Sequence, residues 1–205
     1  MTTRSIYIVD DDDAVRASLH SLLSVRPDTL IRGYRSGDAF LAAIDELEPG
    51  CILLDFHMPG ATGLDVLRAV QGRPGFVAII LTGRGDIALA VEAMKAGAVD
   101  FIEKPYQFAE LSAALEAAYA KLEESNAETA RAGAAAAKLD ALSSREQDVL
   151  KGLIEGRSNK LIAYDLDISP RTVEIYRANV MTKLGVRSLS EALRIAFAAG
   201  LVPGA

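Results

Sequence analysis

The sequence predicts an α/β fold: a doubly wound, five-stranded parallel sheet, followed by a helical linker and a small all-α domain of four helices. Strand-length apolar runs alternate with helix-length segments from Ser5 to about Lys121. An alanine-rich stretch follows, and strand signals are absent after Leu142. Because alternating strands and helices favour a parallel sheet with right-handed crossovers, the first region is expected to be doubly wound.

Five short runs rich in β-branched residues are expected to form the strands of this sheet. They are residues 5–9, 30–34, 51–54, 77–81 and 99–102. All except residues 30–34 are mostly apolar, which is typical of strands buried on both faces of a parallel sheet. The ligand site of such a sheet lies beyond the carboxyl ends of its strands.

The segments between these strands have apolar residues three and four positions apart, which indicates helices. Such residues are Val15, Leu19, Leu22, Leu23, Leu64, Leu67, Val70, Val91 and Met94. One further helix is expected to start near Ser36, and Asp86 is expected to cap the helix that carries Val91.

The last helix of the sheet domain is expected to start after Gln107 and to continue into the alanine-rich residues 127–137. Alanine is the best helix former, so a semi-rigid helix is favoured over a flexible tether, with Gly133 as its weak point. The predicted domains are therefore residues 1–122, a linker over 123–140, and a second domain over 141–205.

Four short helices are predicted after the linker, at about residues 144–155, 158–166, 170–184 and 188–199. Gly156 and Gly185 suit positions just after the first and third of these helices. Ser169 and Pro170 form an N-cap and first-turn pair, which predicts the start of the third helix.

Composition excludes several classes of protein. With 205 residues, 50% of them hydrophobic and 24% charged, the chain can form two cores and is not mainly disordered. No apolar run approaches the roughly 20 residues of a spanning helix and no signal-peptide pattern is present, so no membrane association and a cytoplasmic location are expected. Cys51 is the only cysteine and His20 and His57 the only histidines, which excludes an internal disulfide and disfavours zinc.

The charge is unevenly distributed along the chain. The net charge is −6, but from Asp140 onward nine Lys and Arg face eight Asp and Glu, a net of +1. Within that region, residues 169–187 hold four basic residues against Glu174 alone. This segment is the candidate surface for an anionic partner such as the phosphates of DNA.

Polar residues gather where the predicted strands end. Residues 10–13 are four aspartates after the first strand, Asp55 closes the third, Thr82 closes the fourth, and Lys104 follows the fifth. Several carboxylates brought together repel one another and need a cation. Mg2+, a hard ion that binds oxygen ligands, would offset this repulsion, and Thr82 and Lys104 suit phosphate oxygens.

Each of these residues also has a plainer interpretation. Loop aspartates are commonly solvated or cap helices, and this interpretation is favoured for Asp12 and Asp13, because Asp13 can cap the first helix. Thr82 alone could be an ordinary strand-end hydroxyl and Lys104 a surface charge. The combination with Asp10, Asp11 and Asp55 favours a phosphate site.

The segments VDDDD (9–13), LLDFHMPGATG (53–63), ILTG (80–83) and AGAVDFIEKP (96–105) resemble the receiver domains of two-component response regulators, which are flavodoxin-like folds. The resemblance covers about residues 4–122. It implies that Asp55 accepts a phosphoryl group from a sensor histidine kinase. It also implies that Asp10, Asp11, Asp55 and the backbone carbonyl of His57 hold Mg2+.

The resemblance also implies a switch, in which Thr82 moves toward the phosphoryl group and the ring of Phe101 turns into the vacated space. A plain core aromatic is the alternative role for Phe101. The helix after Asp86, the fifth strand and the helix after Gln107 form the expected contact of a homodimer in the phosphorylated state. His57 is expected at the rim of the site, where it affects the lifetime of the acyl phosphate, rather than as a base.

The predicted helices 158–166 and 170–184 have the spacing of a helix-turn-helix, whose second helix enters the major groove of DNA. A buried side is expected from Ile162, Leu166, Val173, Val180 and Leu184. A small all-α packing module with a solvated charged face is the alternative.

The segments LSSREQDVLKGLIEG (142–156), NKLIAYDLDISPRTVE (159–174) and ANVMTKLGVRS (178–188) resemble the LuxR-type helix-turn-helix. Together with the receiver they resemble the NarL/FixJ class, and within it the FixJ-like proteins. This implies a FixL-like kinase and nitrogen-fixation promoters. By position, Glu174, Ile175, Ala178 and Asn179 would face bases, and Arg171, Thr172, Arg177 and Lys183 phosphates.

The resulting hypothesis is a transcriptional activator, not an enzyme, that phosphorylation of Asp55 switches on, most simply through dimerisation on a two-fold DNA site. A phosphatase is one alternative, disfavoured because His57 rather than an acid lies two residues after Asp55. A DNA-binding regulator that uses its receiver only as a phosphorylation-independent dimerisation scaffold is another.

Overall fold

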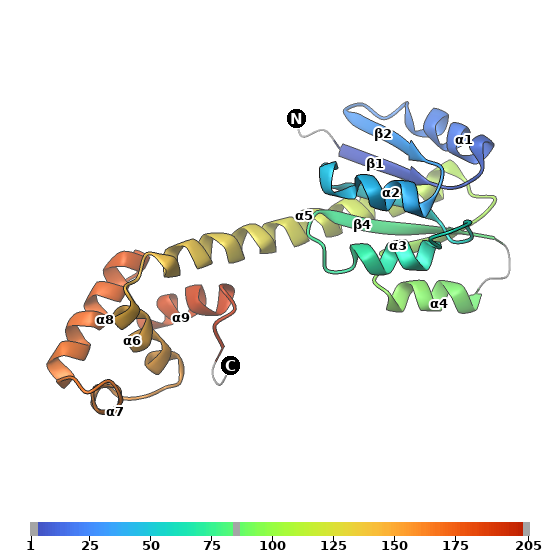
Figure 1. Ribbon diagram of the computed structural model, residues 1–205. Helices are drawn as coiled ribbons and strands as arrows, with labels where there is room; N and C mark the ends of the chain where they lie inside the picture. The colour runs from blue at the N-terminus through green and yellow to red at the C-terminus, as the bar shows by residue number, and fades with distance from the viewer. Residues whose placement is uncertain (1–3, 84–86, 203–205) are drawn as a thin grey trace. The chain divides into compact units, whose positions relative to one another are not determined.

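The computed structural model describes residues 4–83 and 87–202, and the chain divides into two compact units, Met1–Asn126 and Ala127–Ala205. The expected N-cap Asp86 lies outside the described residues. Figure 1 shows the elements of both units.

The first unit is built on a five-stranded parallel sheet, as predicted. Its strands are β1 (Arg4–Val9), β2 (Thr29–Tyr34), β3 (Gly50–Asp55), β4 (Phe76–Thr82) and β5 (Asp100–Glu103). Their order across the sheet is β2-β1-β3-β4-β5. Because β1 lies beside β3 and β4 lies between β3 and β5, the polar residues at the carboxyl ends of these strands share one edge of the sheet.

Helices cover both faces of this sheet (Figure 1). They are α1 (Asp13–Leu23), α2 (Gly37–Ala43) with the 3-10 turn η1 (Ile44–Glu46), α3 (Gly63–Val70), α4 (Ile87–Lys95) and α5 (Phe108–Asp140). One core holds residues of α1 and α5, such as Leu19 and Leu115, and the other holds residues of α2, α3 and α4, such as Phe40, Leu67 and Ala93. The arrangement is the doubly wound fold that the alternating pattern predicts.

The expectation that residues 99–102 are buried on both faces is wrong. In β5 the Ile102 side chain is buried, whereas Phe101 is 45% exposed and Glu103 is exposed. β5 pairs with β4 at the end of the strand order, so it is an edge strand. Side chains alternate between the two faces of a strand, so Ile102 lies in the core while Phe101 and Glu103 lie on the other, exposed face.

The helix α5 runs as one element from Phe108 to Asp140. Its first half packs on the sheet through Leu111, Leu115 and Tyr119, while most residues between 127 and 138 are exposed. The segment predicted as a helical linker, residues 123–140, lies inside this helix, and the boundary between the two units falls after Asn126.

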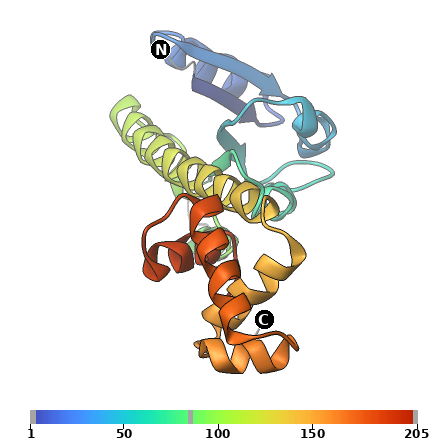
Figure 2. The ribbon, with the colours of Figure 1, turned by 90° about the vertical axis from the view of Figure 1, so that its left-hand side faces the viewer.

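The described part of the second unit contains, after α5, the helices α6 (Ser144–Ile154), α7 (Asn159–Asp165), α8 (Pro170–Leu184) and α9 (Leu189–Ala198), coloured orange to red in Figure 2. Each starts after a serine N-cap whose hydroxyl accepts a backbone N–H, which satisfies a donor that the first turn leaves unpaired. α8 packs on α6, α7 and α9. The four helices therefore form the predicted all-α domain.

No helix within residues 4–83 and 87–202 has both the length and the apolar content needed to cross a membrane.

The weak point of α5 can be tested by substitution. Gly133 lies in the helix, and a Cβ added there would meet no described atom within 4 Å. We expect Gly133→Ala to raise the free energy of unfolding by about 0.5–1 kcal/mol, because alanine loses less backbone entropy in a helix. Gly156 is the matched control: its surroundings are equally open but its φ is +74°. Gly156→Ala should destabilise by about 1 kcal/mol. Denaturant unfolding of both variants measures the change in the free energy of unfolding relative to the wild type. A change of the same sign in both variants would contradict the prediction.

Candidate functional site

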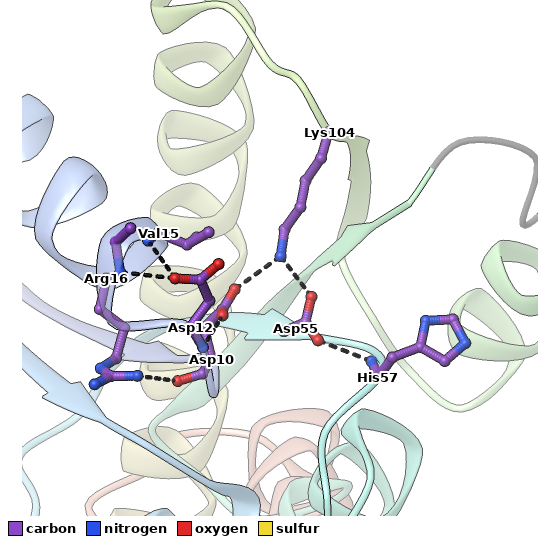
Figure 3. Close-up of polar contacts among 8 residues, drawn as sticks. Asp10, Asp12, Val15, Arg16, Asp55, His57 and Lys104 are labelled. Atoms are coloured by element: carbon purple, nitrogen blue, oxygen red, sulfur yellow. Dashed lines mark hydrogen bonds and ion pairs between the residues drawn. The ribbon is translucent and has the colours of Figure 1, made fainter.

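The acidic residues that the sequence singles out meet a lysine at the carboxyl edge of the sheet (Figure 3). Asp10 follows β1, Asp55 ends β3, and Lys104 follows β5. The Lys104 ammonium donates to Asp10 Oδ2 at 2.8 Å and to Asp55 Oδ1 at 2.5 Å. These three residues, the acidic pocket, bring together groups that lie 94 and 49 residues apart in the chain.

The two carboxylates of the acidic pocket are nearly inaccessible, with Asp10 1% and Asp55 8% exposed. Burial raises the pKa of Asp55 above its ordinary value, although the hydrogen bond and charge of Lys104 oppose the rise. Burial lowers the pKa of Lys104, but its hydrogen bonds to the two aspartates outweigh this, and the pKa is raised. The lysine is therefore held as an ammonium against the carboxylates.

The loop after β1 fixes the orientation of Asp10. Asp10 Oδ1 accepts the backbone N–H of Asp12 at 2.9 Å, and Arg16 donates to the carbonyl oxygen of Asp10 at 2.7 Å. Asp12 caps α1 by accepting from the N–H groups of Ala14 and Val15 (Figure 3). The expectation that Asp13 caps this helix is wrong, because Asp12 has the extended N-cap conformation and its carboxylate accepts the first-turn N–H groups. Asp13 is instead the first helical residue and pairs with Arg16.

The loop after β3 is held by hydrogen bonds at both of its ends. At the start, Asp55 Oδ2 accepts the backbone N–H of His57 at 2.9 Å. At the other end, Asp38 of α2 accepts the N–H of Ala61 at 3.1 Å. Gly60, between them, has a φ of +77°, and a Cβ there would lie 2.3 Å from Asp38 Oδ2. The His57 side chain is exposed, at the rim as expected, and its ring packs edge-on against Phe56.

Two positioning residues escaped the sequence analysis. Arg16 lies three residues after Asp13, a spacing that favours an ion pair on a helix, so its role could have been suspected. Asp38 lies 23 residues from Ala61 and carries no such signal. Its contact exists only because α2 packs beside the loop after β3.

The side chains expected to bind Mg2+ are only partly brought together. Asp10 and Asp55 converge on Lys104, whereas the Asp11 side chain is exposed. Within residues 4–83 and 87–202 no three His, Cys, Asp or Glu side chains form a ready-made metal site. The donors themselves suit a hard cation, since all are carboxylate or carbonyl oxygens. An exposed side chain such as that of Asp11 changes rotamer readily.

The two residues expected to form the switch differ in burial. Thr82 is 4% exposed, and its hydroxyl donates to the carbonyl oxygen of Gly83 at 3.3 Å. Phe101 is 45% exposed, so its alternative role as a core aromatic is wrong. The Phe101 ring therefore has space to move in this structure.

The second unit presents the surface expected to contact DNA on α8. Val173, Val180 and Leu184 are buried as predicted, together with Ile162 of α7, while Leu166 is half-buried. The residues expected at bases or phosphates lie outside this core. Exposed members of the set are Arg171, Glu174, Ile175, Ala178, Asn179 and Lys183, and half-buried members are Thr172 and Arg177. Lys183 also forms an ion pair with Glu146 of α6.

Comparison with known proteins supports this division. The response regulator receiver domain family matches residues 6–116, and the luxR family of bacterial regulatory proteins matches residues 140–196. The chain is 47% identical to the transcriptional regulatory protein FixJ of Bradyrhizobium diazoefficiens, over 98% of this chain and 99% of that protein. It is 39% identical to the C4-dicarboxylate transport transcriptional regulatory protein DctR of Rhodobacter capsulatus, over 93% and 98%. The crystal structure of full-length FixJ from B. japonicum is similar, with a TM-score of 0.59 and 46% identity over 98% of this chain and 100% of that one.

The role of Lys104 as the cation of the acidic pocket can be measured through stability. We expect Lys104→Met to lower the free energy of unfolding by roughly 1–3 kcal/mol, because it leaves two buried carboxylates without their partner. Lys121→Met is the control, since the Lys121 to Glu124 ion pair is exposed and should contribute little. A further Asp10→Asn change should recover part of the loss in the Lys104→Met protein. Equal stability of the two single variants in denaturant unfolding would contradict this role.

Proposed function

The chain belongs to the NarL/FixJ class of two-component response regulators, with a receiver domain and a LuxR-type DNA-binding domain, and on this basis we propose that it is a transcriptional activator switched on by phosphorylation of Asp55. The phosphoryl donor in this proposal is a FixL-like sensor histidine kinase. The observation that carries the proposal is the pairing of buried Asp55 with Lys104 at the carboxyl edge of the sheet.

The chemistry needs little more than a positioned carboxylate and fixed positive charge. An oxygen of Asp55 attacks the phosphorus of the kinase phosphohistidine. A P–O bond forms, the P–N bond breaks, and the imidazole leaves with its electron pair, giving an aspartyl phosphate. The Lys104 ammonium, 2.5 Å from Asp55 Oδ1, would stabilise the negative charge that this step brings to the acidic pocket.

We include Mg2+ as the cofactor of this step. Asp10, Asp11, Asp55 and the backbone carbonyl of His57 would hold it, and all four groups are the hard oxygen donors that Mg2+ prefers. When bound, Mg2+ would spread negative charge over the phosphoryl oxygens. The hydrogen bond from the His57 N–H to Asp55 Oδ2 holds the start of the loop that carries this carbonyl.

Activation is proposed to proceed through dimerisation. The phosphoryl group would draw the Thr82 hydroxyl toward it and let Phe101 turn inward, changing the α4-β5-α5 face. In this structure that face exposes Val91, Met94 and Phe101, at 50%, 43% and 45%. Exposed large apolar side chains on neighbouring elements are typical of protein contacts. A second copy of this chain is the proposed partner.

The dimer is proposed to bind a two-fold DNA site through α8 of each copy. Glu174, Ile175, Ala178 and Asn179 would face base edges, and Arg171, Thr172 and Arg177 would reach phosphates. Nitrogen-fixation promoters are the proposed targets, by analogy with FixJ-like proteins. The relative named for C4-dicarboxylate transport shows that similar chains serve other genes, so the target sequence must be selected experimentally.

The phosphoacceptor is tested directly with acetyl phosphate and Mg2+. We expect the wild-type chain to gain one phosphoryl group by intact mass spectrometry, and Asp55→Asn or removal of Mg2+ with a chelator to abolish the gain. Asp12→Asn is the matched control: it changes a neighbouring acid but keeps an equally good helix cap, so phosphorylation should persist.

Three results would contradict this proposal. Phosphorylation of the Asp55→Asn protein would show that another residue accepts the group. Unchanged DNA binding after wild-type phosphorylation would favour the receiver as a phosphorylation-independent scaffold. Sustained turnover of a small phosphate ester would favour the phosphatase alternative.

The dimer face is tested with a charge on its apolar patch. We expect Met94→Asp to leave acetyl phosphate labelling intact but to keep the phosphorylated protein monomeric in native mass measurements, because a desolvated carboxylate opposes association. Val25→Asp changes a 73% exposed apolar residue of the segment after α1 and should still dimerise. Dimerisation of the Met94→Asp protein to the wild-type extent would exclude this face.

A further inference from the structure

A buried acid lies at the base of the proposed DNA-reading helix. Glu146 lies in the first turn of α6 and is 3% exposed. Among the described residues of the second unit, no other acidic side chain is buried. Its Oε2 accepts the backbone N–H of Ser143 at 2.7 Å and the ammonium of Lys183 at 2.7 Å. Lys183 belongs to the last turn of α8. One carboxylate oxygen therefore joins the start of α6 to the end of α8.

The cap of α6 alone does not require this arrangement. A glutamate at the third helical position needs only the N–H of the capping serine, and it is usually solvated. Here the carboxylate is covered, and a covered charge is stable only when paired. The Lys183 hydrogen bond is the main reason that the pKa of Glu146 is lowered. Lys183 therefore stabilises the buried carboxylate of Glu146, a role that its place on the exposed side of the predicted helix does not indicate.

The Glu146–Lys183 ion pair restricts the rotation of α8 about its own axis, which apolar packing alone does not fix. Val173, Val180 and Leu184 bury one side of α8, but hydrophobic contact has no direction and tolerates small rotations of a helix. Lys183 lies three residues after Val180 and four after Asn179, at the border between the buried and the exposed sides. A hydrogen-bonded ion pair at this border fixes how α8 is turned on α6, and with it the side chains that face outward.

We propose that Lys183 is a positioning residue for DNA recognition, which holds α8 in register on α6 through Glu146 and does not contact phosphate. This inference rests on the proposed DNA-binding function. It differs from the expectation based on motif position, which puts Lys183 at the DNA backbone. A lysine that left Glu146 for a phosphate would strand a buried carboxylate, whereas Arg171 is exposed at the other end of α8.

The test separates positioning from phosphate contact by salt dependence. The acetyl phosphate-treated full chain is assayed against a duplex pool of random sequence and against the duplex that the wild-type chain enriches from that pool, between about 50 and 200 mM salt. Lys183→Met should lose roughly tenfold in affinity for the enriched duplex, comparable with one lost base contact, with little change for the random pool. Its slope of log affinity against log salt should match the wild type.

Arg171→Gln is the matched control. It should weaken binding to both duplexes equally. It should also make the slope of log affinity against log salt shallower by about 0.9 for each bound copy, as expected for a lost phosphate contact. Glu146→Gln, which removes the carboxylate and keeps Lys183, should reproduce the loss of preference seen for Lys183→Met. If the single variants do not fold, the double variant Glu146→Met, Lys183→Met removes both charges together and is expected to fold. It should show the same loss of preference with a wild-type slope.

A shallower slope for Lys183→Met, or an unchanged preference in Glu146→Gln or the double variant, would overturn the positioning role. If the wild-type chain enriches no sequence, the DNA-reading function fails and this inference fails with it. If the wild type enriches a sequence but the salt slope of Lys183→Met is shallower than that of the wild type, the proposed function stands and the inference alone is rejected.

Discussion

The interaction on which the receiver unit depends is the contact of one ammonium with two buried carboxylates. Asp10 and Asp55 repel each other in a poorly solvated place, and Lys104 makes their proximity tolerable. Lys104 follows the edge strand β5 and reaches past the end of β4, which only a long, flexible side chain can do. Any group added to Asp55 must change what this lysine binds. A group added to one oxygen of Asp55 can thereby change the contacts of Lys104, next to the edge strand β5.

The DNA-binding unit uses the same physics for a different purpose. There too a buried carboxylate is paired with a lysine from another element, Glu146 with Lys183. In the acidic pocket the lysine offsets the repulsion between two carboxylates. In the helical unit it holds two helices in register, and no reaction is needed. The same residue types thus have different roles, because one carboxylate lies at the carboxyl end of a strand beside a second acid and the other closes a helix cap.

Local structure was predictable where short-range chemistry decides it. The Ser169 cap and Pro170 at the start of α8 and the left-handed Gly185 after it act within a few residues. The prediction of Asp13 as a cap failed by one position, because two adjacent aspartates offer the same chemistry and the backbone conformation at Asp12 decides between them. The prediction that β5 is buried on both faces also failed, because an apolar run does not reveal whether both faces of the strand are covered.

The sequence by itself determined the two-domain architecture, the five β/α repeats and the identity of Asp10, Asp55 and Lys104 as one group, because these follow from periodicity and from residues at strand ends. Only the tertiary structure decided that Lys104 joins the two carboxylates, that Asp38 holds the loop after β3, and that Lys183 is paired with Glu146. Such contacts depend on how elements pack across tens of residues. No local pattern encodes that packing, since side chains distant in sequence meet only once the cores have formed.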